Sequence, residues 1–195
     1  MIEAMTKSPE TLTEVHGVVN PKMLFEELRR GVLGQDRALR FVSVAIHKHL
    51  LGKVSGNILL IGSSGTGKTT IMNNIQRLYD TVPGFEHFRA VTILNANLLV
   101  DSDRTEFRPD RMFSAIEQRA RVILGERPTL EALKATMESA TVCVDEVDKM
   151  STVIAGKPNP IGVVLQQGLL TLMAVSYTHL RAHETDSYLV CRLLL

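Results

Sequence analysis

A glycine-rich run with a lysine and threonines is the stretch of this sequence with the clearest chemistry. It follows the apolar residues 58–61 and fits the phosphate-binding pattern G-x-x-x-x-G-K-[ST]. Glycines let backbone N–H groups approach phosphate oxygens, and the helix that starts after them directs its positive end at the same place. Lys68 is expected to reach the β- and γ-phosphates of a nucleoside triphosphate, and the Thr69 hydroxyl to hold Mg²⁺. The predicted nucleotide contacts are Gly62, Ser63, Ser64, Gly65, Thr66, Gly67, Lys68, Thr69 and Thr70.

Two adjacent carboxylates further along the chain add a candidate hydrolytic site. Asp145 and Glu146 directly follow the short apolar run Val142-Cys143-Val144, which is typical of a buried parallel strand. Ligands of open α/β sheets bind at the carboxyl ends of such strands. Asp145 is expected to hold Mg²⁺ through water, and Glu146 to polarise the attacking water as a base. Such a pair alone often only ends a strand, but downstream of a phosphate loop it favours catalysis.

Hydrophobic periodicity and the positions of Gly and Pro predict the elements that carry these two sites. Helices are expected over residues 22–30, 35–51, 68–79, 111–124, 129–139 and 161–173. Strands are expected over residues 58–61, 91–94 and 142–145. The charged residues 101–110 are expected to be irregular, with Pro109 delaying the next helix until Arg111. The alternation predicts an α/β fold of the P-loop NTPase type, a parallel sheet with helices on both faces.

The last stretch of the chain is expected not to be native protein sequence. Residues 175–185 and 188–195 back-translate, in one frame, into two parts of a synthetic adapter used in transposase-based DNA sequencing libraries. Asp186 and Ser187 fall where the variable index of such an adapter would lie. We therefore expect residues 174–195 to be a non-native tail. Before it, we expect a mobile arm over residues 1–20 and a nucleotide-binding domain over residues 21–173, incomplete at its C-terminus.

Composition argues against several other classes of protein. The 22 Lys and Arg residues nearly balance 21 Asp and Glu residues, and Trp is absent, which argues against nucleic-acid binding through bulk charge or base stacking. The sequence contains no apolar stretch of about 20 residues, so no membrane span is predicted. The first residues lack the basic-then-apolar order of a signal peptide, so a cytoplasmic location is expected. With the tail set aside, Cys143 is the one remaining cysteine, so neither a disulfide nor a zinc site is expected.

Four motifs in order resemble those of the AAA+ ATPases, and among them the ClpX/HslU type of protein unfoldase. They are the run Val32-Leu33-Gly34-Gln35, the phosphate loop, the run Val144-Asp145-Glu146-Val147-Asp148-Lys149-Met150, and the helix at residues 164–173. The resemblance spans residues 22–173 and implies the large ATPase subdomain of that family. It implies that Val32, Leu33 and Gln35 frame the adenine of ATP. It also implies an ATP- and Mg²⁺-dependent ATPase in a homo-oligomeric ring, usually a hexamer, with a protein substrate favoured over DNA and a protease as candidate partner.

One departure from that family bears on the substrate. ClpX-type unfoldases carry an aromatic–glycine pore loop, G-Y-V-G, whereas residues 99–109 here contain no glycine beside an aromatic residue. Phe107 is either a residue that grips a substrate polypeptide or the anchor of an exposed charged loop. Two other interpretations stay open: an AAA+ motor or loader that acts on DNA, and a nucleotide-gated switch that hardly hydrolyses. A guanine-specifying N-K-x-D element is absent up to Met173, which argues against a GTPase.

The expected reaction is in-line attack of water on the γ-phosphate of ATP. Lys68 and Glu146 are the candidate catalytic residues, because Lys68 neutralises phosphate charge and Glu146 orients the water. Thr69 and Asp145 are the candidate Mg²⁺ ligands. The family resemblance adds an arginine from a neighbouring protomer, worth about 10³–10⁵ in rate.

Overall fold

The computed structural model describes residues 19–53, 56–147, 151–178 and 192–194, and the chain forms two compact units. Unit 1 comprises Met1–Gly56 and Ser63–Gly84, and unit 2 comprises Asn57–Gly62 and Phe85–Leu195. The predicted mobile arm falls almost wholly outside the described residues. Its last two residues do not behave as an arm, because Val19 is buried and Asn20 caps a helix. The phosphate loop from Ser63 onward belongs to unit 1 and the paired carboxylates belong to unit 2.

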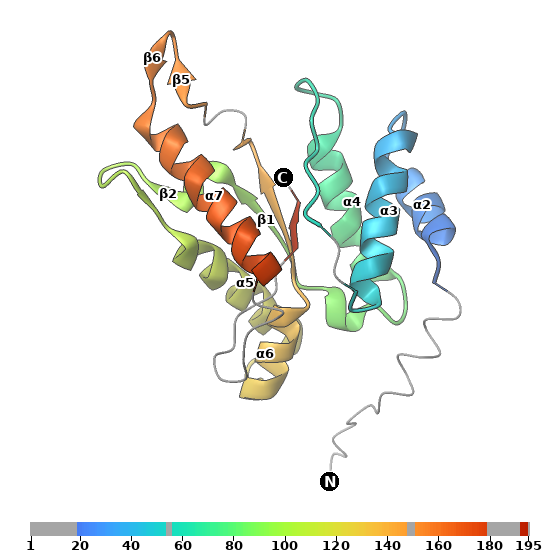
Figure 1. Ribbon diagram of the computed structural model, residues 1–195. Helices are drawn as coiled ribbons and strands as arrows, with labels where there is room; N and C mark the ends of the chain where they lie inside the picture. The colour runs from blue at the N-terminus through green and yellow to red at the C-terminus, as the bar shows by residue number, and fades with distance from the viewer. Residues whose placement is uncertain (1–18, 54–55, 148–150, 179–191, 195) are drawn as a thin grey trace. The chain divides into compact units, whose positions relative to one another are not determined.

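Unit 1 contains the helices α2 (Pro21–Arg29), α3 (Asp36–Leu50) and α4 (Lys68–Thr81), as Figure 1 shows. Helix α2 starts where the sequence predicts, with Pro21 in its first turn and the Asn20 side chain accepting a hydrogen bond from the Met23 N–H at 2.9 Å. Apolar side chains at helical spacing are buried along all three helices. They include Leu24, Leu28, Leu39, Val42, Ile46, Ile71, Ile75, Leu78 and Tyr79. The predicted helices over residues 22–30, 35–51 and 68–79 are confirmed.

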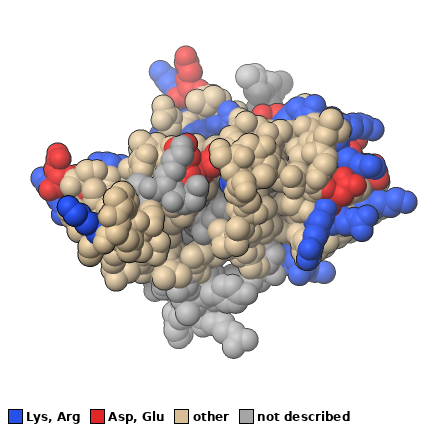
Figure 2. Space-filling view, turned by 90° about the horizontal axis from the view of Figure 1, so that it is seen from above, with Lys and Arg blue, Asp and Glu red and all other residues tan. Residues whose placement is uncertain are grey.

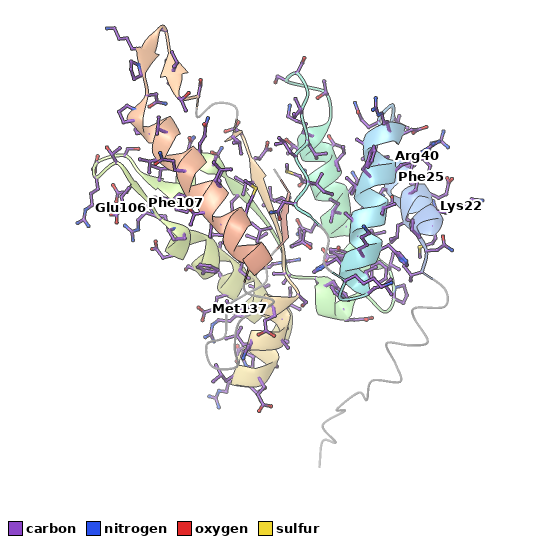
Figure 3. All side chains as sticks on the ribbon, viewed as in Figure 1. Lys22, Phe25, Arg40, Glu106, Phe107 and Met137 are labelled. Carbon is purple, nitrogen blue, oxygen red and sulfur yellow. The ribbon has the colours of Figure 1, made fainter. Side chains whose placement is uncertain are left out.

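The exposed side of α2 and α3 is basic, although the chain as a whole is nearly neutral. Figure 2 shows blue Lys and Arg atoms outnumbering red ones over these helices. The exposed basic residues are Lys22, Arg29, Arg30, Arg37, Arg40 and Lys48, against the acidic residues Glu26, Glu27 and Asp36. The Phe25 ring lies between two of these cations, with the Cζ atoms of Arg40 and Arg29 at 5.7 and 6.0 Å from its centroid (Figure 3). Positive charge therefore gathers on this side of unit 1, although the net charge of the whole chain is close to zero.

Unit 2 is built on a parallel sheet with the strand order β1-β4-β7. Strand β1 (Val91–Asn95) pairs with β4 (Thr141–Asp145), and β4 pairs with β7 (Arg192–Leu194). One face of the sheet packs on helices α5 (Pro109–Leu124) and α7 (Pro160–Thr178) through Leu94, Val142 and Val144. Helix α6 (Leu130–Glu138) follows α5, with the Thr129 side chain as its cap, and short 3₁₀ turns lie at Glu86–Phe88 and Ala96–Leu99. The mixed α/β class and its parallel pairing agree with the prediction.

The apolar run before the phosphate loop differs from the prediction of a buried strand. Of residues 58–61, Ile58 alone takes part in a β-bridge, and the side chains of Leu59 and Ile61 are 61% and 87% exposed. A strand needs a backbone partner as well as apolar side chains, and the sheet order β1-β4-β7 does not include residues 59–61. Strand β7 comes from the tail that the sequence analysis sets aside, and α7 continues to Thr178, past its predicted end.

Unit 2 also contains two small antiparallel hairpins, the first of them in the charged segment that the sequence predicts as irregular. One joins β2 (Val100–Asp101) to β3 (Glu106–Phe107), and the other joins β5 (Val153–Ile154) to β6 (Lys157–Pro158). Helix α5 begins at Pro109 itself, because proline suits the first turn of a helix, so the predicted delay to Arg111 is wrong. Among the helices of the described ranges, none has both the length and the apolar character needed to cross a membrane.

Asp101 is the centre of the first hairpin. Its carboxylate accepts hydrogen bonds from the backbone N–H groups of Asp103 and Arg104 at 3.1 and 3.2 Å. It also lies 3.5 Å from Arg108 Nη1 and 3.7 Å from Arg111 Nη2. The pKa of Asp101 is lowered, chiefly because the Arg104 N–H donates to the charged form and also because the Arg111 charge lies nearby. These polar contacts, which local propensity does not reveal, hold the charged segment in one conformation.

Phe107 is a packing residue of this hairpin and not an exposed aromatic. Its ring lies against Gly168 of α7, so closely that a Cβ atom at position 168 would overlap the ring (Figure 3). The hairpin residues that are exposed, Ser102 to Glu106, are polar or charged. Of the two roles considered for Phe107, the structure supports the anchor and not the substrate grip.

Replacing Gly168 by Ala should therefore destabilise the protein. An exposed helical Gly→Ala change stabilises by up to about 1 kcal/mol, whereas overpacking costs about 1–3 kcal/mol. We expect the free energy of unfolding, measured by urea titration, to fall by roughly 1–2 kcal/mol. The double variant Gly168→Ala, Phe107→Ala should recover the helix propensity gain relative to Phe107→Ala alone. A Gly168→Ala variant that is more stable than the parent would show that Phe107 does not pack here.

Candidate functional site

The phosphate loop has a backbone that glycine alone adopts readily. Gly65 and Gly67 have φ values of 79° and 90°, in the left-handed region. Gly67 is the residue at which the chain turns into α4, so the loop ends directly at the N-terminus of a 14-residue helix. The residues from Gly62 to Thr66 are exposed to solvent. An exposed turn of this shape at a helix start is a site where backbone N–H groups can bind an anion.

Short hydrogen bonds within the loop converge on one carbonyl oxygen. Ser63 O accepts from the backbone N–H and the hydroxyl of Thr66, at 3.3 and 2.8 Å. The same oxygen accepts from Lys68 Nζ at 3.0 Å, so the Lys68 side chain folds back over the loop. A cation in the first turn of a helix adds to the positive end of the helix dipole, and both attract an anion. The loop therefore fits the phosphates of a nucleotide.

Thr69 and Thr70 lie in the first turn of α4 and are exposed. A hydroxyl next to the phosphate-binding lysine is the position from which Mg²⁺ is held in a phosphate loop. Asp145, at the end of β4, is a half-buried carboxylate of the kind Mg²⁺ prefers. Each donor suits Mg²⁺ in its own unit. Within the described residues, no group of three or more His, Cys, Asp and Glu side chains forms a further metal site.

The turn between α2 and α3 contains the three residues proposed to frame adenine, and they lie in different surroundings. Val32 is 2% exposed and belongs to the core, whereas the Leu33 side chain is 89% exposed. Gly34 has a left-handed φ of 75° and turns the chain between Leu33 and the start of α3. Gln35 donates from Nε2 to Thr66 O at 2.8 Å. The structure thus brings Gln35 to the phosphate loop itself, a contact that the spacing of motifs did not predict.

The carboxylates stand at the carboxyl end of the parallel pair β1–β4, as predicted for an α/β ligand site. Asn95, the last residue of β1, is in register with Asp145, the last residue of β4. Glu146 follows with a left-handed φ of 61°, and its backbone N–H donates to Asp145 Oδ1 at 2.8 Å. The Asn95 side chain donates from Nδ2 to Glu146 Oε2. Glu146 is thereby aimed by a neighbouring strand and by an unusual backbone conformation.

Asn95 is a site residue that the sequence analysis missed. The available signal was a polar residue at the end of a predicted strand, next to the strand that delivers the carboxylates. Parallel neighbours end at the same edge of a sheet, so such residues meet. Asparagine is also common where a strand ends and a turn begins, at places that have no function. The signal is therefore weak unless the pairing of the strands is known.

Cys143 lies in β4, the strand that ends at Asp145. Its side chain is fully buried in β4, two residues before Asp145. Burial, and to a lesser degree the charge of Asp145, raise the pKa of the thiol to about 12. It is therefore a packing residue and is not chemically reactive at neutral pH.

Comparison with known proteins finds a family and several relatives. Residues 57–161 match the AAA domain (dynein-related subfamily). The chain is 30% identical over 189 residues to the ATP-dependent Clp protease ATP-binding subunit ClpX of Bacteroides thetaiotaomicron, which aligns 88% of this chain and 40% of that protein. It is 34% identical over 83 residues to the ATP-dependent protease ATPase subunit HslU of Rickettsia prowazekii, covering 37% of this chain and 18% of that protein. Protein MoxR of Methylorubrum extorquens is 27% identical over 115 residues, covering 55% of this chain and 32% of that protein. The chain spans less than half the length of each of these relatives.

Alkylation of Cys143 tests whether β4 is the buried strand described. In a Cys191→Ser variant, which removes the other cysteine, the ordinary thiol pKa of 9.0 against about 12 predicts roughly a thousandfold less thiolate at pH 8. We expect mass spectrometry to show no iodoacetamide adduct in native buffer and complete reaction in denaturing urea. Native labelling at the rate of a free cysteine would contradict the placement of Cys143, and with it that of Asp145 and Glu146.

Proposed function

Because this chain belongs to the AAA+ ATPases, we propose that it binds ATP with Mg²⁺ and hydrolyses it to ADP and phosphate. The family match covers more than half of the 195 residues, over residues 57–161. The observation that carries the proposal for this chain is the phosphate loop, with Gly65 and Gly67 in left-handed conformations and Lys68 folded over it at the start of α4. That combination suits the phosphates of a nucleotide.

The reaction assigned to the site needs positioning and charge more than covalent chemistry. Backbone N–H groups of the loop and Lys68 bind and neutralise the phosphates. Thr69 and Asp145 are the residues that would hold Mg²⁺, which would supply positive charge to the phosphate oxygens. Glu146 accepts a hydrogen bond from the attacking water, and the Asn95 amide fixes the carboxylate orientation for that task.

For the cellular role, we favour ATP-driven unfolding or remodelling of proteins. The support is the similarity to ClpX over 88% of this chain, together with the shorter similarity to HslU. By the same similarity we propose a homo-oligomeric ring, a hexamer, in which a neighbouring subunit supplies an arginine, and a protease as partner. The packed Phe107 and the polar hairpin tip argue that cargo is not gripped by an aromatic at this position.

A second candidate, action on DNA, rests on the basic side of α2 and α3 (Figure 2). Six exposed basic residues against three acidic ones form a local positive surface, of the kind that binds phosphate backbones. Duplex DNA binding that weakens steeply with salt, and that is lost when Arg37 and Arg40 are changed to Glu, would favour this role over protein remodelling.

The proposed domain organisation is a large ATPase subdomain over residues 21–173, whose complete sheet has helices on both faces, followed by a non-native tail over residues 174–195. The adapter-like back-translation of residues 175–195 supports the tail assignment. If the tail is foreign, the sheet position taken by β7 beside β4 belongs to a native strand. Reading the genomic locus across the codon of Met173 with unamplified long reads decides this point.

A pair of substitutions tests the proposed reaction. Lys68→Ala removes the charge that neutralises the phosphates, and should abolish ATP binding in isothermal titration calorimetry. Glu146→Gln keeps the shape of the side chain but removes the base, so ATP binding should stay near the parental value while turnover falls at least a hundredfold. Turnover is measured as phosphate release by the longest native form of the chain. Equal turnover by the parent and Glu146→Gln would refute the role assigned to Glu146.

A further inference from the structure

We infer that Gln35 and Asn74 form a two-amide clasp, which ties the turn between α2 and α3 to the phosphate loop and its helix, and that Gln35 orients a phosphate-binding N–H group. The inference rests on the proposed nucleotide-binding function. It assigns Gln35 as a positioning residue for the phosphates, in place of the adenine contact suggested by the motif. All the residues involved lie in unit 1.

The first half of the clasp joins Gln35 to the middle of the phosphate loop. Gln35 Nε2 donates to Thr66 O at 2.8 Å, across 31 residues of sequence. The Gln35 side chain also lies beside the next residue, since a Cβ at Gly67 would be 3.9 Å from Gln35 Cγ. Thr66 stands between the two left-handed glycines, Gly65 and Gly67.

The geometry of the peptide group makes this contact important for the phosphates. In a trans peptide, the carbonyl of one residue and the N–H of the next point in opposite directions. None of the described peptide bonds is cis. Holding Thr66 O toward Gln35 therefore points the Gly67 N–H away from Gln35. That N–H group is one of the donors of a phosphate loop.

The second half of the clasp joins the same turn to α4. Asn74 Nδ2 donates to Gly31 O at 3.3 Å and to Thr70 O, one helical turn earlier, at 2.9 Å. A Cβ atom at Gly31 would overlap the Asn74 amide, so glycine is required there for the approach. Gly31 and Gln35 are the two ends of one turn, and both are fastened to the phosphate-binding element.

This arrangement predicts communication between the base and the phosphates. Leu33, 89% exposed, stands in the middle of the clasped turn and is the residue there available to touch a base. A base that settles against Leu33 restrains the turn, and the turn restrains the Thr66–Gly67 peptide through Gln35. The ligand class is a nucleotide that carries both a base and a polyphosphate.

The test compares ATP with inorganic tripolyphosphate, which has the phosphates but no base. We measure the affinity of each for the parent chain and for Gln35→Leu by calorimetry in the presence of Mg²⁺. Loss of one orienting hydrogen bond should weaken both ligands by about 5- to 10-fold. If ATP weakens while tripolyphosphate is unchanged, Gln35 acts as a base contact and the inference is overturned.

The control is Gln76→Leu on α4, which makes the same chemical change at another half-buried position and should leave both affinities unchanged. Thermal melts of the three proteins check that each is folded.

Hydrogen exchange without any ligand separates this inference from the proposed function. In the ligand-free chain, Gln35→Leu should speed amide exchange in peptides covering residues 63–70 several-fold, and Asn74→Leu should do so for residues 31–35. Unchanged exchange in both variants would overturn the clasp even if ATP binds. If the parent binds neither ATP nor tripolyphosphate, the nucleotide function fails, while altered exchange still supports the clasp as a structural device.

Discussion

The direction of one peptide group, between Thr66 and Gly67, is the constraint on which the candidate site most depends. With its carbonyl held by Gln35 and the next residue in a left-handed conformation, the chain passes from an exposed loop directly into the N-terminus of α4. Lys68 folds over the same turn to Ser63 O. Gly67 adopts the left-handed conformation readily because it has no Cβ. The helix start and the Lys68 charge together suit an anion.

The second site follows from a different kind of constraint, the pairing of parallel strands. Register places Asn95 beside Asp145, and the left-handed Glu146 turns the chain so that its carboxylate meets the Asn95 amide. Positioning of this sort suits a reaction whose barrier is lowered by orientation and charge. The same unit uses ion pairs for a different purpose in the hairpin around Asp101, where they order a polar tip and leave Phe107 free to pack on Gly168.

What could be predicted from the sequence was chiefly local. The start of α4 and the run into Asp145 and Glu146 are specified by neighbours in sequence, so glycine spacing and strand composition were enough. Pairing was not predictable in the same way: residues 58–61 have the composition of a strand, yet only Ile58 among them takes part in a β-bridge. The hairpin at Val100–Phe107 depends on Arg108 and Arg111 reaching back to Asp101, which no periodicity reveals. The contacts of Gln35 and Asn95 likewise join residues 31 and 51 positions apart.

The central proposal is that the glycine loop of unit 1 binds nucleotide phosphates and that the paired carboxylates of unit 2 act in the hydrolysis. The most direct measurement is amide hydrogen exchange across the whole chain, with and without a non-hydrolysable ATP analogue and Mg²⁺. The account predicts protection in peptides covering residues 62–70, in the turn at residues 31–35, and at the end of β4 around residues 144–147. Exchange that is unchanged over residues 62–70 would contradict the account, and protection there without any at residues 144–147 would contradict the role assigned to the carboxylates.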